Sequence, residues 1–394
     1  MRALLLGMWL SLGPMPASAQ TAAVPAAEMK IGHITSEPAS SESPGKVIGA
    51  YFKKINDEGG INGRRIRYIV SHVGESQPKA VEAVRTLVED DQVALLLATV
   101  ETPTGSAVQK FLNQHRVPHL LLANGASRWS DPKNFPWTMA WRVHYRTEGR
   151  MYARYALATI PDAKIGVLYQ NDDYGRDYRK GFMDELGDRA RRMVVLEQTY
   201  EVTDPTVDAQ IVNLKNSGAN IFVNVTIPKF AVQAIKKSND IGWKPLHFLN
   251  NVSSSLGTVL KPAGLEASRG IITSRYLKDP TDPAVKNDAG YKEWVAFMQK
   301  YQPDGALNDD VNVFGYTVAQ GLAHVLKQCG NDLSRANLMK QAASIKDLSL
   351  PLLLPGIKVN TSPTDHAAIE QAQLAKFDGE RWVPFGEIHD ASKK

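Results

Sequence analysis

Pro161-Asp-Ala-Lys-Ile-Gly-Val-Leu-Tyr-Gln-Asn-Asp-Asp-Tyr-Gly175 is the stretch of this chain that decides the fold. Its apolar run from Ile165 to Tyr169 predicts a strand that stops at polar turn residues, and Tyr174-Gly175 then opens a predicted helix. Such a unit places an aromatic side chain at the carboxyl end of a strand, where open α/β sheets bind ligands. A similar strand and turn occupy residues 93–105. Two such units, one in each half of the chain, predict two lobes that face one ligand.

Outside these two units, strands and helices alternate along the chain. Strands are predicted at residues 29–34, 65–73, from 93, and at 119–123, 165–170, 194–200, 221–225 and 246–250. Helices are predicted at residues 47–58, 79–89, 105–114, from 178, and at 207–216, 231–239 and 311–326. Strands that alternate with helices of this length predict parallel sheets built from right-handed crossovers.

The amino terminus predicts export. Arg2 precedes an apolar run at residues 3–12 and the small residues Ala17-Ser-Ala19, a pattern typical of a secretory signal peptide at residues 1–19. No later segment reaches about 18 uninterrupted apolar residues, so no membrane anchor is predicted. Cys329 is the only cysteine, which excludes an internal disulfide and a lipid-modified terminal cysteine. We therefore expect an exported protein that is stabilised by core burial.

Composition and charge narrow the function classes. The 43% hydrophobic and 22% charged content is ordinary for a globular protein. The formal net charge is +5, and basic residues are interleaved with acids, which favours solvated helix faces over a nucleic-acid surface. Nucleic acid is therefore not an expected partner. Removal of the signal would leave roughly 375 residues, enough for two large cores.

Enzyme motifs are missing from the sequence. It contains no phosphate-binding loop of the Gly-x-x-x-x-Gly-Lys-Ser/Thr type, and Gly59-Gly60-Ile-Asn-Gly63 follows a predicted helix where a dinucleotide fingerprint would follow a strand. None of the nine histidines belongs to a His-Glu-x-x-His motif or forms a close pair with Cys329, so no zinc site is predicted. Cys329 itself follows an apolar predicted helix and is expected to end it as a small apolar residue. The sequence predicts no catalysis, no cofactor and no metal site.

Several motifs carry a resemblance to a known family. They are Ile55-Asn-Asp-Glu-Gly-Gly-Ile-Asn-Gly-Arg64, Gln77-Pro-Lys-Ala-Val81, Asn124-Gly-Ala-Ser127, Asn171-Asp-Asp-Tyr-Gly175, Asp204-Pro-Thr-Val-Asp208, Asp240-Ile-Gly-Trp-Lys244 and Leu354-Pro-Gly-Ile357. Together they span nearly the whole mature chain, which resembles the periplasmic solute-binding proteins of ABC importers in the branched-chain amino-acid (Leu/Ile/Val-binding) group. The resemblance implies a type I periplasmic-binding-protein fold, in which two doubly wound α/β lobes with parallel sheets are joined by a multi-segment hinge.

The resemblance also implies domain boundaries and partners. Lobe 1 would comprise residues 28–143 and 275–357, and lobe 2 residues 144–274 and 358–394, with crossings near 141–145, 271–276 and 356–360. Such a protein would be a periplasmic monomer that captures a small organic ligand and delivers it to an ABC transporter permease in the inner membrane. The alternatives are a ligand sensor of the same fold that signals to a membrane partner, and an exported hydrolase.

The family pattern assigns binding roles to particular residues. Thr102, Ala126 and Ser127 match positions where backbone amides and small hydroxyls of lobe 1 hold a ligand carboxylate, although helix capping would also explain the two hydroxyls. Tyr174 matches an aromatic residue that closes over the ligand from lobe 2. The further candidates are Glu101, Thr226, Asn250, Asn251 and Tyr276.

Departures from the family pattern leave the ligand class open. Glu101 stands where a small residue is expected and would repel a ligand carboxylate, and no acid near Asn250-Asn251 is available for an ammonium group. The first turn, residues 35–45, contains no aromatic residue. One interpretation is a small carboxylate without an amino group, aromatic or not, contacted by Tyr174, Trp129, Arg275 and Tyr276. The other is that Glu101 binds the cationic part of an amine or amide, and an amino acid also remains a candidate ligand.

Overall fold

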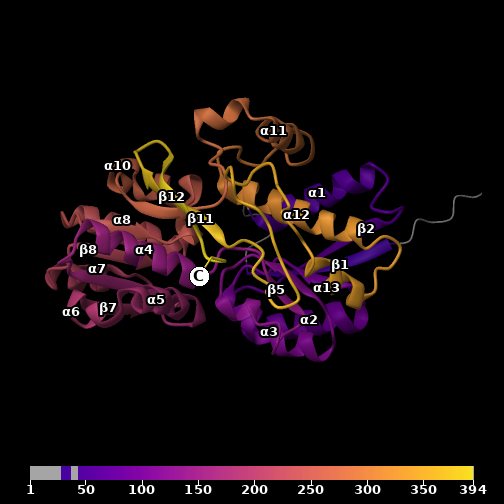
Figure 1. The fold of residues 1–394 in the computed structure, drawn as a ribbon, viewed down its shortest axis with the longest axis horizontal. Coiled ribbons are helices and arrows are strands. Elements are labelled where there is room, and N and C mark those ends of the chain that lie inside the picture. Colours follow the sequence, from indigo (N-terminus) through magenta and orange to yellow (C-terminus); the bar gives the residue numbers. More distant parts are fainter. Residues whose placement is uncertain (1–27, 37–42, 394) are drawn as a thin grey trace, which may run out of the picture.

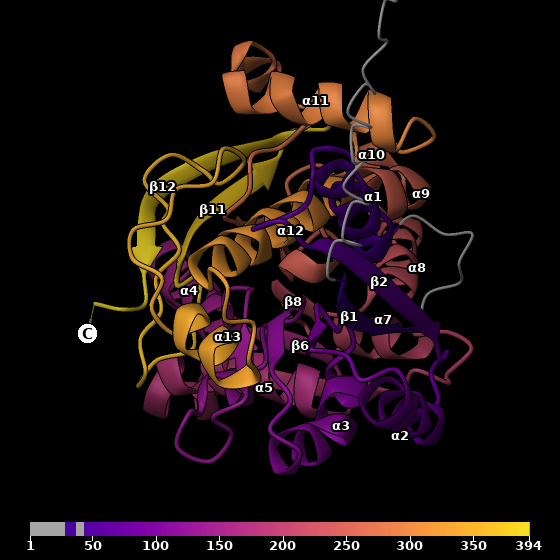
Figure 2. The same cartoon turned by 90° about the vertical axis from the view of Figure 1, so that its right-hand side faces the viewer.

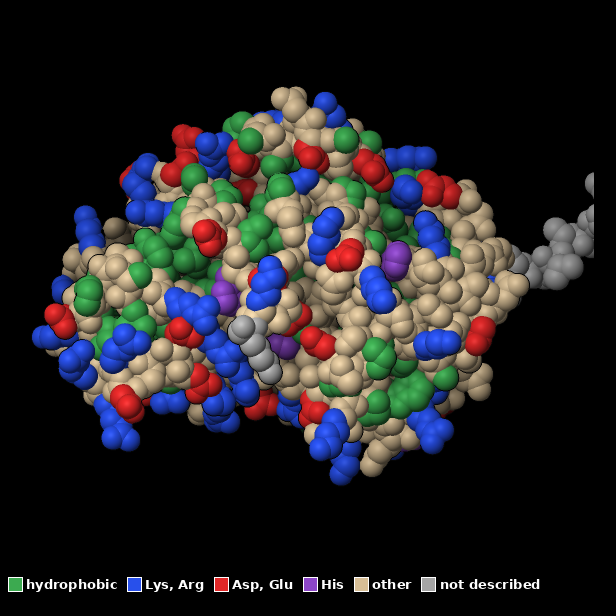
Figure 3. All heavy atoms as spheres, viewed as in Figure 1, with side chains coloured by type: hydrophobic (Ala, Val, Ile, Leu, Met, Phe, Trp, Pro, Cys, Tyr) green, Lys and Arg blue, Asp and Glu red, His purple; other side chains and the backbone are tan. Residues whose placement is uncertain are grey.

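The computed structural model of this protein describes residues 28–36 and 43–393. The predicted signal peptide and residues 37–42 of the first turn lie outside the described residues. Within them, the strands form two separate sheets, and each sheet is the centre of one half of the molecule (Figure 1). Acidic and basic side chains are interspersed over the face seen in Figure 3. No helix in the described ranges combines the length and apolarity that crossing a bilayer requires.

The first sheet has the order β2-β1-β3-β4-β5, and all of its neighbouring strands are parallel. Its strands are β1 (Glu28–Thr35), β2 (Arg65–His72), β3 (Leu95–Leu97), β4 (His119–Leu122) and β5 (Thr138–Ala140). The helices of this half are α1 (Pro44–Asp57), α2 (Gln77–Arg85), α3 (Thr102–Gln114), α11 (Ala289–Tyr301), α12 (Asp310–Gln328) and α13 (Arg335–Ala342). Apolar residues of α1 and α12 share one buried cluster with those of β1, β3 and β4.

The second sheet has the order β12-β11-β10-β9-β8-β6-β7. Its strands are β6 (Ile165–Gln170), β7 (Val194–Tyr200), β8 (Ile221–Val225), β9 (Leu246–Leu249), β10 (Ile272–Arg275), β11 (Gln371–Phe377) and β12 (Trp382–Asp390). The helices of this half are α4 (Tyr145–Thr159), α5 (Asp173–Leu186), α6 (Ala190–Met193), α7 (Asp208–Asn216), α8 (Pro228–Asp240), α9 (Lys261–Ala263) and α10 (Leu265–Ser268). The strands from β6 to β10 are parallel, whereas β11 and β12 are antiparallel to their neighbours.

Both sheets are wound in the same way. If β6 is counted as the first strand of its half, the parallel strands of each sheet run in the order 2-1-3-4-5. In this order, the direction in which successive strands are added to the sheet reverses between β1 and β3 in one sheet and between β6 and β8 in the other. Ligands of doubly wound sheets bind beyond the carboxyl ends of the strands at such switch points. The predicted doubly wound α/β architecture is therefore confirmed, and it positions a site between the two halves.

The chain passes between the halves in three places. The first passage follows β5, the second follows β10, and the third precedes β11. The third lies later than the predicted crossing at 356–360, because Ala367 still forms a bridge with Ala140 of β5. The β11–β12 hairpin, shown in yellow in Figure 2, was not predicted. Its signal is the turn at Asp378-Gly379, where Gly379 has a φ of 106° between two segments of alternating polarity.

Helices α4 and α5 pack unusually closely because each contributes a glycine to the contact. A Cβ on Gly149 of α4 would lie 2.4 Å from the carbonyl oxygen of Tyr178, and one on Gly181 of α5 would lie 2.2 Å from that of Arg146. The close approach sets the position of α5, whose first turn carries Tyr174 toward the other half. Helix α4 was not among the predicted helices.

Three buried histidines give the fold a specific pH dependence. Burial lowers the pKa of His33 to about 4 and the pKa values of His119 and His247 to about 3. These imidazoles stay neutral in the native protein while the unfolded chain takes up protons below about pH 6.5. The free energy of unfolding should therefore fall as the pH decreases from about 6.5 to 4, by up to about 1.4 kcal/mol per pH unit for each histidine.

Denaturant titrations of wild type and the His247→Gln variant between pH 7 and pH 4 test this expectation. The variant should lose stability less steeply, because one buried proton acceptor is gone. The comparison also removes the opposite contribution of Glu370, whose pKa burial raises to about 7 and which is present in both proteins. Equal slopes in the two proteins would contradict the assignment.

Candidate functional site

A cavity of about 620 Å³ lies between the two halves, at the carboxyl ends of both sheets. Its lining residues follow the strands of each sheet. From the first half they include Ser36 after β1, residues 100–104 after β3, Ala123 after β4 and Arg142 after β5. From the second half they include residues 170–172 and Tyr174 near the end of β6, Glu201 and Val202 after β7, Ile227 and Pro228 after β8, Asn251 and Val252 after β9, and Arg275 of β10. The cavity therefore joins the switch points of the two sheets.

Much of the cavity wall is apolar. The first half contributes Val100, Ala123, Leu277, Val311 and Phe314, and the second contributes Val202, Ile227, Pro228 and Val252. The volume falls within the range of about 300–1,000 Å³ that is typical of small-molecule sites. Apolar walls with a few polar groups suit a ligand that has an apolar body and one or two polar ends.

Tyr174 lines the cavity, but its hydroxyl group is committed to its own half. The hydroxyl donates to the carbonyl oxygen of Thr226 at 3.1 Å and accepts from Nδ2 of Asn250 at 2.6 Å. Neither Thr226 nor Asn250 lines the cavity, and both are fully buried behind Tyr174. Only the ring of Tyr174 is therefore offered to a ligand. The ring is 3% exposed and packs edge-on against Tyr145, so its truncation would also damage the core.

Ser127 and Ala126 do not line the cavity. The backbone N–H and the hydroxyl of Ser127 both donate to the carboxylate of Asp177 in α5, each at 2.8 Å. Asp177 also accepts from Arg146, and the neighbouring Arg128 pairs with Asp173 at 2.7 Å. The groups that sequence reasoning assigned to a ligand carboxylate thus hold a carboxylate of the protein, which joins the two halves. Trp129 is fully buried in the core and donates to Asn124, so it is no ligand platform.

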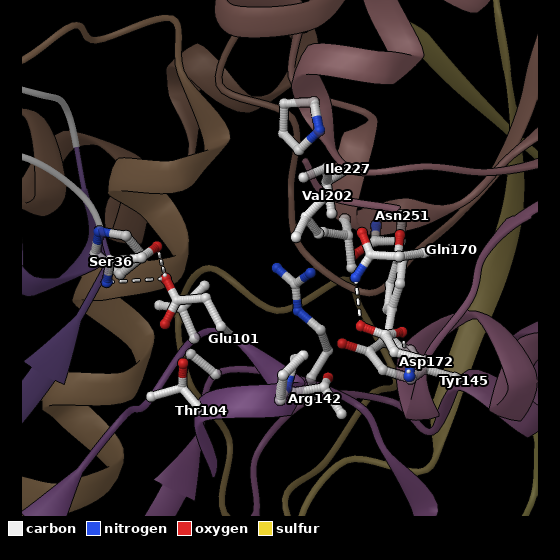
Figure 4. Close-up of a pocket in the computed structure, with 18 of the residues that line it drawn as sticks. Ser36, Glu101, Thr104, Arg142, Tyr145, Gln170, Asp172, Val202, Ile227 and Asn251 are labelled. Carbon is white, nitrogen blue, oxygen red and sulfur yellow. Dashed lines mark hydrogen bonds between the residues drawn. The ribbon is translucent and has the colours of Figure 1, made fainter. Parts of the chain in front are cut away.

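Glu101 and Thr102 both line the cavity at the start of α3. Oε1 of Glu101 accepts from the backbone N–H of Ser36 at 3.2 Å and from its hydroxyl, whereas Oε2 is buried without a hydrogen-bond partner among the described residues (Figure 4). Burial raises the pKa of Glu101, which favours its neutral form. The hydroxyl of Thr102 donates to Asn124 at 3.2 Å.

The remaining candidates lie near β10. Asn251 lines the cavity, and its backbone N–H and side-chain amide donate to Glu148 and to Ser274, each at 2.7 Å. Arg275 also lines the cavity, where it forms a buried ion pair with Asp310 of α12 at 2.5 Å. Tyr276 is 1% exposed and is not a lining residue.

Sequence reasoning missed Arg142, which follows β5 and lines the cavity. Its guanidinium group points into the cavity, between Glu101 on one side and Asp172 on the other (Figure 4). The guanidinium carbon lies 4.7 Å from the centre of the Phe314 ring, and Nε has no hydrogen-bond partner among the described residues. The available signal was a single basic residue between the buried Trp141 and Val143, directly after a strand.

Comparisons with known proteins place this geometry in a family. The sequence profile described as periplasmic binding protein matches residues 28–381. The chain belongs to the periplasmic binding protein family. This family is extracytoplasmic, and its members bind small ligands and work with ABC transporters.

Individual relatives are distant in sequence. The Leu/Ile/Val-binding protein homolog 7 of Brucella suis is 23% identical over 263 residues, which cover 63% of this chain and 64% of that protein. A branched-chain amino-acid ABC transporter protein from Thermus thermophilus, solved with bound valine, superposes with a TM-score of 0.81 at 14% identity over 93% of this chain and 97% of its own. A solute-binding protein from Rhodopseudomonas palustris, solved with 3,4-dihydroxybenzoic acid, gives a TM-score of 0.75 at 18% identity over 92% and 98%. These likenesses establish the type I periplasmic-binding-protein fold.

Proposed function

We propose that this protein is the solute-binding component of an ABC importer, which captures a small organic ligand between its two lobes and delivers it to an inner-membrane permease. The observation that carries the proposal is the cavity, because its walls come from the strand ends of both sheets. Solved neighbours of this fold hold valine and 3,4-dihydroxybenzoic acid, which are both small carboxylic acids. We assign residues 28–143 and 276–367 to one lobe and residues 144–275 and 368–394 to the other, because β10 ends at Arg275 and Ala367 still pairs with Ala140.

Capture in this arrangement depends on hinge closure. A ligand that contacts Val100 or Phe314 on one wall and Val202 or Ile227 on the other binds the closed state better than the open state. That difference in affinity shifts the equilibrium toward closure. The permease would then recognise the closed form, in which both lobes have one fixed relative orientation.

Export would follow from the signal peptide at residues 1–19, with the mature protein working as a monomer in the periplasm. Catalysis forms no part of the proposal. Among the described residues no histidine or cysteine lines the cavity, so it offers neither a serine–histidine nor a cysteine–histidine pair.

A thermal-shift screen of the mature protein, residues 20–394, tests the proposed function. The panel contains amino acids, aliphatic acids, aromatic acids and neutral or cationic analogues of each. A ligand present at about 100 times its dissociation constant adds about 2.7 kcal/mol to the stability of the native protein, which raises the unfolding temperature by several degrees. At least one class should produce this shift. Silence across all classes would contradict capture of a small organic ligand.

A further inference from the structure

Two arginines line the cavity, and they differ in whether an acid of the protein pairs with them. Arg275 is neutralised by Asp310 at 2.5 Å and also donates to Ser254 at 3.3 Å. Arg142 takes part in none of the ion pairs found between described residues, and its Nε lacks a hydrogen-bond partner there. Its guanidinium group lies against the face of Phe314, and, against the effect of burial, the neighbouring Tyr276 and Glu148 raise the pKa of Arg142 without appearing among the ion pairs of the described residues.

A guanidinium group that lines a cavity without a counter-ion is expected to bind an anion there. Arginine cannot lose its proton in a protein, so it cannot relieve the cost of burial by becoming neutral. Contact with apolar surface removes part of its hydration, and an anion is the partner that restores the lost electrostatic energy. The planar fork of N–H donors matches the two oxygens of a carboxylate.

The acids that line the cavity do not provide that anion, because other groups already use them. Asp172 caps α5 by accepting from the backbone N–H groups of Tyr174 and Gly175. Glu201 accepts from Asn171, Glu101 accepts from Ser36, and Glu75 is exposed to solvent. Glu101, Asp172 and Asp310 also stand at the amino-terminal ends of α3, α5 and α12, where the helix dipole stabilises negative charge.

The acids that line the cavity are also poorly placed to pair with an ammonium group. Asp310 is paired with Arg275, Glu101 and Asp172 accept hydrogen bonds from the protein and have pKa values raised by burial, and Glu75 and Glu201 are exposed to solvent. Around Asn251, which lines the second half, the neighbouring acid Glu148 is buried and accepts from Asn251 and Tyr152. An α-amino acid would therefore bring a positive charge for which the described residues offer no buried acid free of other partners.

We infer that Arg142 anchors the carboxylate of the ligand, and that the ligand is a monocarboxylate with an uncharged, largely apolar body and no α-ammonium group. This inference rests on the proposed function and names the ligand class of that same site. The apolar walls formed by Val100, Val202, Ile227 and Phe314 receive the body. Tyr174 adds its ring to them, and Oε2 of Glu101, which has no hydrogen-bond partner among the described residues, is available to a polar substituent at the far end.

The wild-type test uses matched sets of compounds in titration calorimetry. The first set contains an acid, its amide and its α-amino acid counterpart, namely phenylpropanoate, phenylpropanamide and phenylalanine. The second contains benzoate, benzamide and the amine benzylamine, and the third contains octanoate, octanamide and 2-aminooctanoate. At least one acid should bind, with its amide and its amino acid at least about 30-fold weaker, as expected when one partner of a desolvated charge pair is missing. Binding of amides, amines or amino acids that equals or exceeds that of the acids would overturn the inference and leave the proposed function standing. If no compound binds, the result contradicts both the inference about the ligand class and the proposed function.

Titrations of Arg142 variants with the acid that binds best provide the second test. Arg142→Gln removes the charge and should weaken the best acid at least about 30-fold, whereas Arg142→Lys keeps the charge without the planar fork and should lie between the two. Arg154→Gln is the matched control, since Arg154 is exposed on α4 and pairs with Glu185 outside the cavity. The unfolding temperature of each ligand-free variant confirms that it is folded. If Arg142→Gln binds the acid as tightly as Arg154→Gln does, Arg142 is not the anchor.

Discussion

Replacing Asp310 by alanine is expected to lower the free energy of unfolding by about 3 kcal/mol. The carboxylate of Asp310 neutralises Arg275, whose side chain is 3% exposed, and the pair crosses from α12 of the first half to β10 of the second. Removal of the acid leaves a buried guanidinium group without a counter-charge, which costs more than the net contribution of the intact pair. Equilibrium denaturation in urea measures the loss.

A double variant that lacks both charges distinguishes this explanation from simple loss of packing. The variant that combines Asp310→Leu with Arg275→Met removes both charges and keeps the volume, so it should be more stable than Asp310→Ala alone. The two charges also line the ligand cavity, and a second unpaired cation there would compete with Arg142 for a carboxylate. If the double variant is less stable than Asp310→Ala, the buried charge is not the cause of the loss.

Replacing Gly181 by alanine is expected to destabilise the protein by about 3 kcal/mol and to weaken ligand binding at the same time. The new Cβ would lie 2.2 Å from the carbonyl oxygen and 2.5 Å from the Cα of Arg146 in α4. Both contacts are with backbone atoms, so no side-chain rotation relieves them, and α5 must move away. The first turn of α5 carries Tyr174 and Asp172 into the cavity wall, so the displacement reaches the site.

Gly49→Ala in α1 is the matched control for this effect. The nearest atom to its new Cβ is a ring carbon of Tyr68 at 3.3 Å, which belongs to a side chain that can shift by a few tenths of an ångström. Alanine also has the higher helix propensity, so this variant should be close to neutral. Thermal unfolding of both variants decides between backbone contact and a general intolerance of alanine, since equal losses at the two positions would contradict the close packing of α4 against α5.

The alternating strands and helices could be predicted because each has a local signal in the sequence. Runs such as Ile165–Gln170 and Ile221–Val225 show strand character, and the helices between them carry regular apolar faces, so the structure has strands at those same bounds. The extension of the second sheet could not be read in this way. Strands β11 and β12 follow a long irregular segment, and only the turn at Asp378-Gly379 indicates a hairpin.

The site was predicted only in part, because the roles of its polar groups are decided by partners far away in the sequence. Thr102, Glu101, Tyr174 and Asn251 line the cavity, since each follows a strand that the sequence reveals. Ser127 carries the right donors, but Asp177, 50 residues later in the chain, accepts from them. In the sequence Arg142 looks like any isolated basic residue, and only the structure places it in the cavity, outside the ion pairs of the described residues.

The most direct test of the proposed binding site is a crystal structure of the mature protein with the carboxylate that binds best in the titrations. We predict ligand density in the cavity between the two sheets, with both carboxylate oxygens within hydrogen-bond distance of the Arg142 guanidinium group and the apolar body against Val202, Ile227 and Phe314. Density outside the cavity, or a carboxylate that faces solvent while Arg142 stays unpaired, would contradict both the site and its anchor.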